Sequence, residues 1–235
     1  MPIDHPIISL RRSRGFTIIE ILVAMSILAV VMGLIFGTFE GVFSNSSHVN
    51  AGSDLYKMAD NCLKRISIDL KSLHVMQQPI YQMPGTDSKP DIFRLEGKNE
   101  GFGGNDFSHL RFTSLAHLSM SRIQSEGIAE IVYYVQEMAN NSYVLRRADK
   151  LYPYPETFEP KETDPILCEQ VRSFKLVYFD KEGREHEEWD SEDDNYEFST
   201  PKTIAVHLKL GDSENTYDFS TEIAMPMHRF VSPKR

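Results

Sequence analysis

An apolar run from Phe16 to Phe39 constrains the fold of this chain more than any other stretch. Its 24 residues, FTIIEILVAMSILAVVMGLIFGTF, carry one formal charge, that of Glu20. A helix of this length, rising about 1.5 Å per residue, crosses a bilayer core of roughly 30 Å. Because the run is apolar around its whole circumference, it fits lipid better than the one-sided burial of a soluble helix. The sequence therefore predicts a transmembrane helix over residues 16–39.

The charges on either side of this helix predict its orientation. Arg11, Arg12 and Arg14 precede it, whereas Glu40 and a polar stretch follow it. Since positive charge stays on the cytoplasmic side, we expect residues 1–15 in the cytoplasm and the rest of the chain exported. The apolar run is too long for an ordinary secretory signal, and the residues GTFEGVF after it hold no A-x-A cleavage pattern. On hydropathy alone, a plain signal anchor remains an open alternative.

The charge balance and the absence of known motifs exclude several classes of function. Lys and Arg total 25 against 34 Asp and Glu, and a net charge of -9 disfavours binding to nucleic acid. The sequence holds no G-x-S-x-G elbow, no H-E-x-x-H helix and no phosphate-binding P-loop. The eight histidines are scattered, and His109 and His117 lack a Cys, Asp or Glu at ligand spacing. We therefore expect no enzyme activity, no metal site and no cofactor.

A second helical pattern follows the apolar run. Apolar residues recur at three- and four-residue steps: Leu55, Met58, Cys62, Ile66, Leu70 and Leu73. Charged residues, assigned to the polar side, lie between them: Lys57, Asp60, Lys64, Asp69 and Lys71. The pattern predicts an amphipathic continuation of the helix over residues 40–75 that packs on a folded domain. The polar stretch from Ser44 to Ser53 leaves a kink open, and Pro79 and Pro84-Gly85 place the helix end near Leu73 to Val75.

The remainder of the chain, residues 76–235, has the alternation and turn residues of a β-rich domain. Strand-like segments cover residues 107–115, 128–137, 143–147, 171–179, 203–210 and 217–225. Residues 139–142 predict a hairpin, and Gly183 and Gly211 predict turns. No helical pattern of about ten to fifteen residues separates these strands, so the sheet should be mainly antiparallel. The predicted fold class is α+β, with a long N-terminal helix packed on an antiparallel β-rich globular domain.

Two features of the exported part have two interpretations each. Cys62 lies on the apolar face of the helix and Cys168 just before a strand. In an oxidising compartment they would form a disulfide if their Cα atoms come within range, and otherwise they are two buried free thiols.

Eight acidic residues fall between Glu182 and Asp194. Since the EF-hand spacing is absent, a solvated acidic loop is favoured over a calcium site.

The start of the apolar helix resembles a known signature. The sequence Arg14-Gly15-Phe16-Thr17-Ile18-Ile19-Glu20 is similar to the type IV prepilin motif, in which Phe-Thr-x-x-Glu follows a basic leader and a glycine. The resemblance implies that a prepilin peptidase removes residues 1–15, cleaving between Gly15 and Phe16, and N-methylates Phe16. A carboxylate in an apolar membrane helix costs several kcal/mol unless it is paired, protonated or interfacial. The resemblance gives Glu20 a partner for assembly, the free α-amino group of a neighbouring subunit; an interfacial Glu20 remains the alternative.

The β-rich part resembles the J-type minor pseudopilin of the type II secretion system. The similar pieces, in order, are Leu110-Arg111-Phe112-Thr113, Ile131-Val132-Tyr133-Tyr134, Leu145-Arg146-Arg147, the segment from Val171 to Asp180 with Gly183 and Trp189, and Ser199-Thr200-Pro201-Lys202 before the strand from Thr203 to Leu210. The resemblance implies a pilin-like fold and a non-enzymatic role in a pseudopilus tip complex, which primes filament assembly for export of folded proteins across the outer membrane.

The same resemblance implies partners and a location. The partners are the I-type and K-type minor pseudopilins, other pseudopilins, the prepilin peptidase and the inner-membrane assembly platform. The protein would cross the inner membrane once, with its C-terminal domain in the periplasm. Two alternatives remain open: a minor pilin of a type IV pilus or competence-type filament, and a membrane-anchored periplasmic enzyme or binding domain. A simple anchor would need neither Gly15-Phe16 nor Glu20, which disfavours the second.

Overall fold

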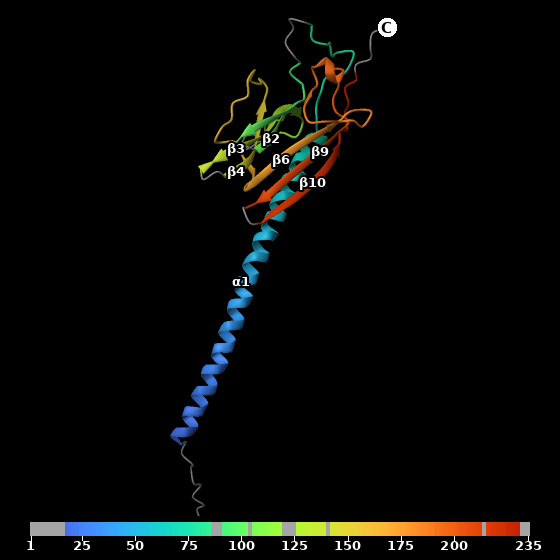
Figure 1. Ribbon diagram of the computed structural model, residues 1–235. Helices are drawn as coiled ribbons and strands as arrows, with labels where there is room; N and C mark the ends of the chain where they lie inside the picture. Colours follow the sequence, from blue (N-terminus) through green and yellow to red (C-terminus); the bar gives the residue numbers. More distant parts are fainter. Residues whose placement is uncertain are drawn as a thin grey trace, which may run out of the picture. The chain divides into compact units, whose positions relative to one another are not determined.

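A computed structural model describes residues 17–85, 91–102, 105–118, 126–139, 142–212 and 215–230, without the side chains of residues 40–51, 102, 105 and 106. The chain forms two compact units, Met1–Gly52 and Ser53–Arg235. Each unit is described by itself. The order of the elements along the chain can be followed in Figure 1.

The helix α1 (Ile18–Lys71) is unbroken through the polar stretch where the sequence left a kink open. It ends at Lys71, two residues before the predicted range of Leu73 to Val75. The backbone of Leu73 forms an isolated antiparallel bridge with Ser114, and the Leu115 N–H donates to the Ser72 carbonyl at 2.9 Å. The helix ends there because residues at the end of β2 form these backbone interactions with Ser72 and Leu73 in place of a further helical turn.

Ten strands of the described chain form one sheet. Their bounds are β1 (Glu96–Phe102), β2 (Asn105–Ser114), β3 (Ala129–Met138), β4 (Ser142–Leu151), β5 (Ile166–Cys168), β6 (Val171–Phe179), β7 (Glu185–His186), β8 (Trp189–Asp190), β9 (Thr203–Gly211) and β10 (Thr216–Ala224). A 3-10 helix, η2 (Asp194–Tyr196), lies between β8 and β9.

The sheet runs in the order β10-β9-β6-β2-β3-β4-β5, with β1 added beside β2 and the short β7 and β8 beside β6 and β1. Neighbours are antiparallel except at the centre, where β2 and β6 pair in parallel with Phe107 opposite Phe174. The hairpin between β3 and β4 keeps an unshifted register from Ala129 opposite Leu151 to Met138 opposite Ser142. The prediction of an α+β fold with a mainly antiparallel sheet is confirmed.

Six of the strands coincide with the segments expected from the sequence, and four do not. The four missed strands are β1, β5, β7 and β8. The sequence of β1, EGKNEGF, has none of the β-branched residues that mark a strand. It is held by its neighbours instead, because β1 pairs along its full length with β2 and at one end with β8. The other three are two or three residues long and have no recognisable pattern.

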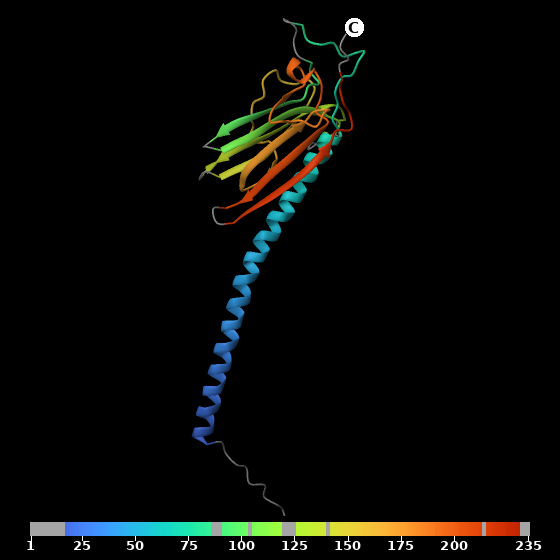
Figure 2. The ribbon, with the colours of Figure 1, turned by 45° about the vertical axis from the view of Figure 1, so that its right-hand side comes forward.

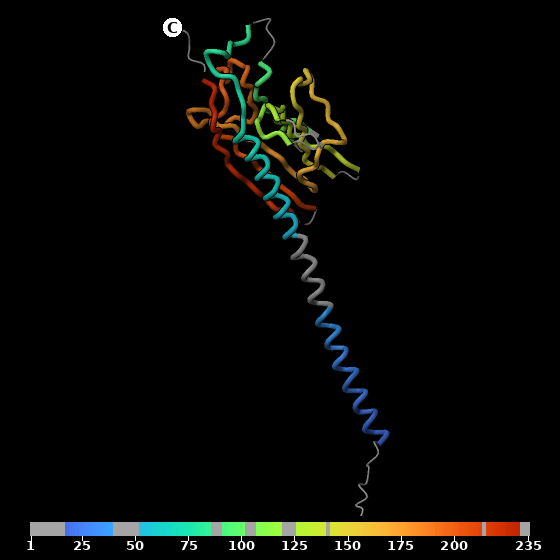
Figure 3. Tube along the Cα trace, turned by 180° about the vertical axis from the view of Figure 1, so that it is seen from behind, coloured from blue at the N-terminus to red at the C-terminus, as the bar shows by residue number. Residues whose placement is uncertain are grey.

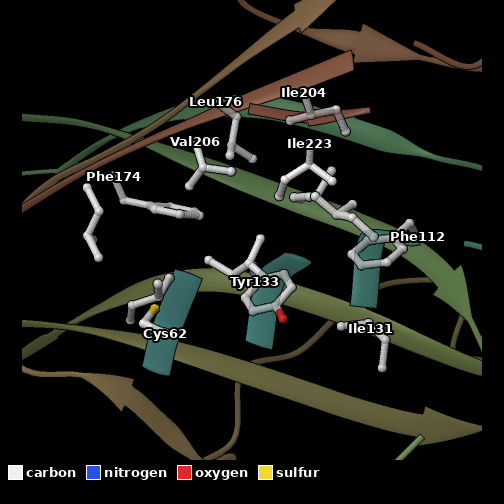
Figure 4. Packing of buried hydrophobic residues seen from close by; sticks show 14 of the residues in the cluster. Cys62, Phe112, Ile131, Tyr133, Phe174, Leu176, Ile204, Val206 and Ile223 are labelled. Carbon is white, nitrogen blue, oxygen red and sulfur yellow. The ribbon is translucent and has the colours of Figure 1, made fainter. Parts of the chain in front are cut away.

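The core lies between the C-terminal part of α1 and one face of the sheet, as Figures 2 and 3 show for residues 53–71. The helix contributes fully buried side chains at three- and four-residue steps, Ala59, Cys62, Ile66 and Leu70, and Leu73 just beyond its end is buried as well. Figure 4 shows side chains of β6, β9 and β10, among them Phe174, Val206 and Ile223, filling the same interior as Cys62. The predicted amphipathic spacing therefore describes the buried face of this segment.

Candidate assembly site

The first turn of α1 is closed by Thr17. The Glu20 N–H lies 3.1 Å from the Thr17 carbonyl oxygen and 3.4 Å from its Oγ1, and the Ile21 N–H donates to the same carbonyl at 3.2 Å. Thr17 and Glu20 have the Thr-x-x-Glu spacing of a capping box, so the Phe-Thr-x-x-Glu sequence also suits a helix start. Gly15 and Phe16, the predicted cleavage and methylation residues, lie outside the described residues.

The segment Ile18–Phe39 of α1 is long and apolar enough to cross a membrane, with a mean hydropathy of 2.7 over its most apolar window and none of that window buried inside the protein. Its hydroxyl groups are satisfied within the helix: Ser26 Oγ donates to the Leu22 carbonyl and Thr38 Oγ1 to the Ile35 carbonyl, each at 2.8 Å. Such internal bonds remove the cost of placing a hydroxyl in hydrocarbon. The surface of this segment is therefore suited to lipid or to another apolar helix.

Glu20 is the exception on this surface. Its side chain is exposed, and within the described residues its carboxylate has no hydrogen-bond or ion-pair partner. An unpaired carboxylate one turn into an apolar membrane helix is unfavourable, so it favours a partner from outside the chain. The structure thus leaves Glu20 able to accept a cation, but it does not place one there.

In the unit Ser53–Arg235 a second carboxylate of α1, that of Asp69, is fully buried against the sheet. Its Oδ2 lies 2.6 Å from Nε of Arg147 on β4 and accepts a hydrogen bond from the Tyr133 hydroxyl on β3, while its Oδ1 pairs with Arg65 one turn back. Arg147 also lies 2.6 Å from Asp149. The sequence pattern had assigned Asp69 to the polar side of the helix, which is wrong. Its partner Arg147 lies 78 positions away, so no local spacing reveals the pair.

The environment of this pair shifts two pKa values. Burial raises the pKa of Tyr133 well above its ordinary value, and the neighbouring Asp69 charge raises it further. Burial opposes the charge on Arg147, but the hydrogen bonds that it donates to Asp69 and Asp149 outweigh this effect and raise the pKa of the guanidinium. At physiological pH Tyr133 therefore stays a neutral hydrogen-bond donor and Arg147 a charged one. The role of the cluster is to hold α1 in one register on β3 and β4, because a charge moved by one helical turn would lose its partners.

A cavity of about 450 Å³ lies beside β2, β3 and the segment after β4. Its polar side chains are engaged with one another: Arg111 Nε lies 2.7 Å from Glu130, and its Nη2 donates to the Pro155 carbonyl at 2.6 Å. Burial raises the pKa of Glu130, although Arg111 opposes the shift. No nucleophile lies beside a general base among its described lining residues.

Two family models match the sequence: the prokaryotic N-terminal methylation motif over residues 10–36, and type II secretion system protein J over residues 37–220. The chain belongs to the protein J family of the type II secretion system. No curated protein matches the sequence. Family membership and the N-terminal motif together make it a minor pseudopilin of that system, as the resemblance implied. They imply association with other pseudopilins and with the prepilin peptidase, and a structural, non-enzymatic role.

The pieces that carried the resemblance form the centre of this protein J chain. Leu110 to Thr113 lies in β2 and Ile131 to Tyr134 in β3, and Arg111 and Glu130 of these strands form an ion pair. The segment from Leu145 to Arg147 lies in β4 and supplies the cation for Asp69. Trp189 in β8 is buried and donates to the Ser199 carbonyl at 2.9 Å. These motifs therefore correspond to buried cross-strand and helix–sheet contacts.

Acidic residues in and beside the run from Glu182 to Asp194 form hydrogen bonds and ion pairs within the protein J domain. Asp180 accepts hydrogen bonds from the Glu182 and Arg184 N–H groups at 3.0 and 2.9 Å, and Glu192 pairs with the buried Arg229. No group of three or more His, Cys, Asp or Glu side chains in the described residues could hold a metal ion. The expected solvated loop is thus in part a structured turn.

The two cysteines of the protein J domain lie side by side. Cys62 on α1 and Cys168 at the end of β5 are both buried with free thiols, and both belong to the cluster of buried core residues. The structure thus has the two buried free thiols of one interpretation, and a disulfide between them stays a prediction.

Proposed function

We propose that this protein J chain enters the tip complex of the pseudopilus together with the I-type and K-type minor pseudopilins, and primes assembly of the filament. The observation that supports this is the joining, in one chain, of a prepilin-type helix start to a protein J domain. The apolar segment Ile18–Phe39 supplies a helix for packing in the filament, and the β-rich unit supplies lateral contacts. The cytoplasmic ATPase and the inner-membrane platform then drive growth, which moves folded proteins toward the outer-membrane secretin.

The proposal includes processing at the N-terminus. The prepilin peptidase removes residues 1–15 by cleavage after Gly15 and methylates the new amino group of Phe16. Arg11, Arg12 and Arg14 hold this end in the cytoplasm, and the β-rich unit faces the periplasm. Helix α1 starts immediately after the cleavage point, at Thr17 and Ile18, so the mature chain begins with the assembly helix.

Glu20 is proposed as the residue that registers this helix in the filament. Its carboxylate would pair with the α-amino group of Phe16 on a neighbouring subunit. Each charge is unfavourable in hydrocarbon when it is unpaired, so pairing stabilises both. A helix displaced by one turn would leave both charges unpaired. Such a pair contributes more to correct register than to overall stability.

The processing is tested by intact-mass and N-terminal peptide analysis of the full chain expressed with and without a prepilin peptidase. We expect loss of residues 1–15 and one methyl group on Phe16 when the peptidase is present. A Gly15→Ala variant should remain uncut and serves as the control. A wild-type chain that begins at Met1 under both conditions would reject the proposed processing and return the N-terminus to a plain anchor.

The place in the tip complex is tested by co-purification in detergent of the processed chain with I-type and K-type partners from the same system. We expect a stable complex of all three, and weaker retention of a major pseudopilin alone. Recovery of the chain with neither partner would contradict a tip role, while the family assignment would still hold.

A further inference from the structure

Cys62 and Cys168 come from parts of the chain that are far apart in sequence and meet in the core of the β-rich unit. Cys62 is 1% exposed on the buried face of α1, and Cys168 is 0% exposed at the end of β5. Both side chains belong to the same cluster of buried core residues. Helix α1 is held against this point by further contacts, because Cys168 Sγ lies 3.9 Å from the Met58 carbonyl and the Glu169 N–H lies 3.3 Å from Met58 Sδ.

The strand that carries Cys168 is short and lies at the edge of the sheet. β5 has three residues, lies at the edge of the sheet and has two register partners in β4, with an irregularity between them. Within the described residues no strand pairs on its other side. Few backbone hydrogen bonds to neighbouring strands therefore hold Cys168 beside α1.

We propose that Cys62 and Cys168 are joined by a disulfide in the exported protein, which ties α1 to the edge strand β5. The inference rests on the proposed periplasmic location of this unit, since disulfides persist in that compartment. The two thiols lose two protons and two electrons as the S–S bond forms. The electrons pass to the disulfide of a periplasmic thiol oxidoreductase, which becomes a dithiol.

The folded structure also predicts when this bond forms. Contact with Cys168 and burial raise the pKa of the Cys62 thiol, so the folded protein holds almost no reactive thiolate there. Both sulfurs are closed off from an oxidoreductase once α1 is packed on the sheet. The bond therefore forms before or during docking of α1, and afterwards it is shielded from reducing agents.

The disulfide would close a loop that contains β1, β2, β3 and β4. Closing a loop of about 100 residues restricts the unfolded chain strongly, and for a domain of this size its removal lowers Tm by roughly 10 °C. The stabilised element is the docking of α1, the helix that also bears the membrane segment.

The test uses the full chain purified from cell membranes without reducing agent, denatured and treated with a maleimide. We expect no maleimide addition, a mass about 2 Da below that of the reduced chain, and one tryptic peptide pair that contains both cysteines. Two additions per chain, or a disulfide-linked dimer on a non-reducing gel, would overturn the proposal. Protease treatment of spheroplasts in the same experiment reports whether the β-rich unit is exported, so a failure of the proposed topology is distinguished from a failure of the disulfide.

The matched control is a Cys62→Ala/Cys168→Ala double variant. It should melt near the temperature of the wild-type chain reduced in denaturant and refolded, and both should melt well below the oxidised wild type. Equal melting temperatures for oxidised and reduced wild type would reject a stabilising bond. Reductant added to the native oxidised chain should leave the bond intact for hours, and rapid reduction would contradict the shielding.

Discussion

Asp69 and Asp60 show that the contribution of a carboxylate to stability depends on its position on the helix. Both lie on α1, and each pairs with a cation four positions away: Asp69 with Arg65, which precedes it, and Asp60 with Lys64, which follows it. The side chain of Asp60 is 57% exposed, whereas that of Asp69 is 0% exposed and also pairs with Arg147. An exposed pair contributes little, but removal of one partner of a buried pair leaves the other charge unsatisfied.

We therefore expect Asp69→Ala to lower the free energy of unfolding by about 3–5 kcal/mol. Asp60→Ala should lower it by less than about 1 kcal/mol and serves as the matched control. The measurement is denaturant unfolding of the full chain in detergent, followed by the near-ultraviolet signal of the β-rich unit. Similar losses in the two variants would show that the Asp69 cluster does not hold the helix.

Two buried tyrosines provide a second comparison at the scale of a single atom. The Tyr133 hydroxyl donates to Asp69, while the Tyr178 hydroxyl is buried and has no partner in the described structure. Tyr133→Phe should cost about 1.5–3 kcal/mol, because a hydrogen bond to a charged group is lost. Tyr178→Phe should be neutral or stabilising, since an unsatisfied hydroxyl is removed. Thermal melts of both variants decide this, and a larger loss for Tyr178→Phe would contradict the assigned partners.

Among the elements, the turn between β6 and β7 has the most pH-sensitive geometry. Burial opposes ionisation of Asp180, but the Arg184 N–H, His186 and the Arg184 guanidinium bond to its carboxylate and hold the pKa of Asp180 well below its usual range. A carboxyl whose folded pKa is lowered stabilises the fold above its unfolded pKa of about 3.9, and this contribution is lost as the pH falls further.

Asp180→Asn should therefore lower Tm at neutral pH and have a shrinking effect as the pH falls from about 4 to about 2. The difference in Tm between wild type and variant, measured across this range, tests the sign of the shift. Asp218→Asn is a suitable control, because Asp218 pairs with Lys209 on an exposed surface with a side chain that is 76% exposed. A difference for Asp180→Asn that stays constant from neutral pH to about pH 2 would contradict the lowered pKa.

The elements also show which parts of the fold can be predicted from sequence. The apolar run, the amphipathic spacing of α1 and six strands were predictable, because each depends on a local pattern. β1 was not, since its sequence EGKNEGF becomes a strand through pairing with β2. The parallel pairing of β2 with β6 and the salt bridge of Asp69 with Arg147 depend on contacts across the fold. At the candidate site, Glu20 could be proposed because a charge is conspicuous in an apolar run, whereas Asp69 resembled any solvent-facing acid.

At the scale of the whole molecule, the proposal makes Glu20 an assembly residue that the isolated chain does not need. Glu20→Leu and Glu20→Gln should insert into the membrane and be cleaved as the wild type is. Their recovery with pseudopilin partners should fall roughly tenfold or more, equivalent to about 1.4 kcal/mol or more of lost interaction. Quantitative immunoblots of cross-linked filament fractions measure this.

Ser26→Ala is the matched control for these variants, because Ser26 lies on the same helix and its hydroxyl bonds within the helix to Leu22. It should assemble as the wild type does. Wild-type recovery of Glu20→Leu would show that this carboxylate is an interfacial residue, and the proposed pairing with Phe16 would be rejected.

The burial of Asp69 also has a mechanical consequence. In the proposed assembly, a subunit drawn out of the bilayer would be pulled by its helix, and the β-rich unit would have to follow. A force along α1 acts on Ala59, Cys62, Ile66 and Leu70 together, and the Asp69–Arg147 ion pair resists sliding of the helix past β4. Because these contacts carry the force at the same time, the interface between α1 and the sheet would withstand a pull that would break contacts loaded one after another. Extraction would then move the domain as a body instead of unravelling it.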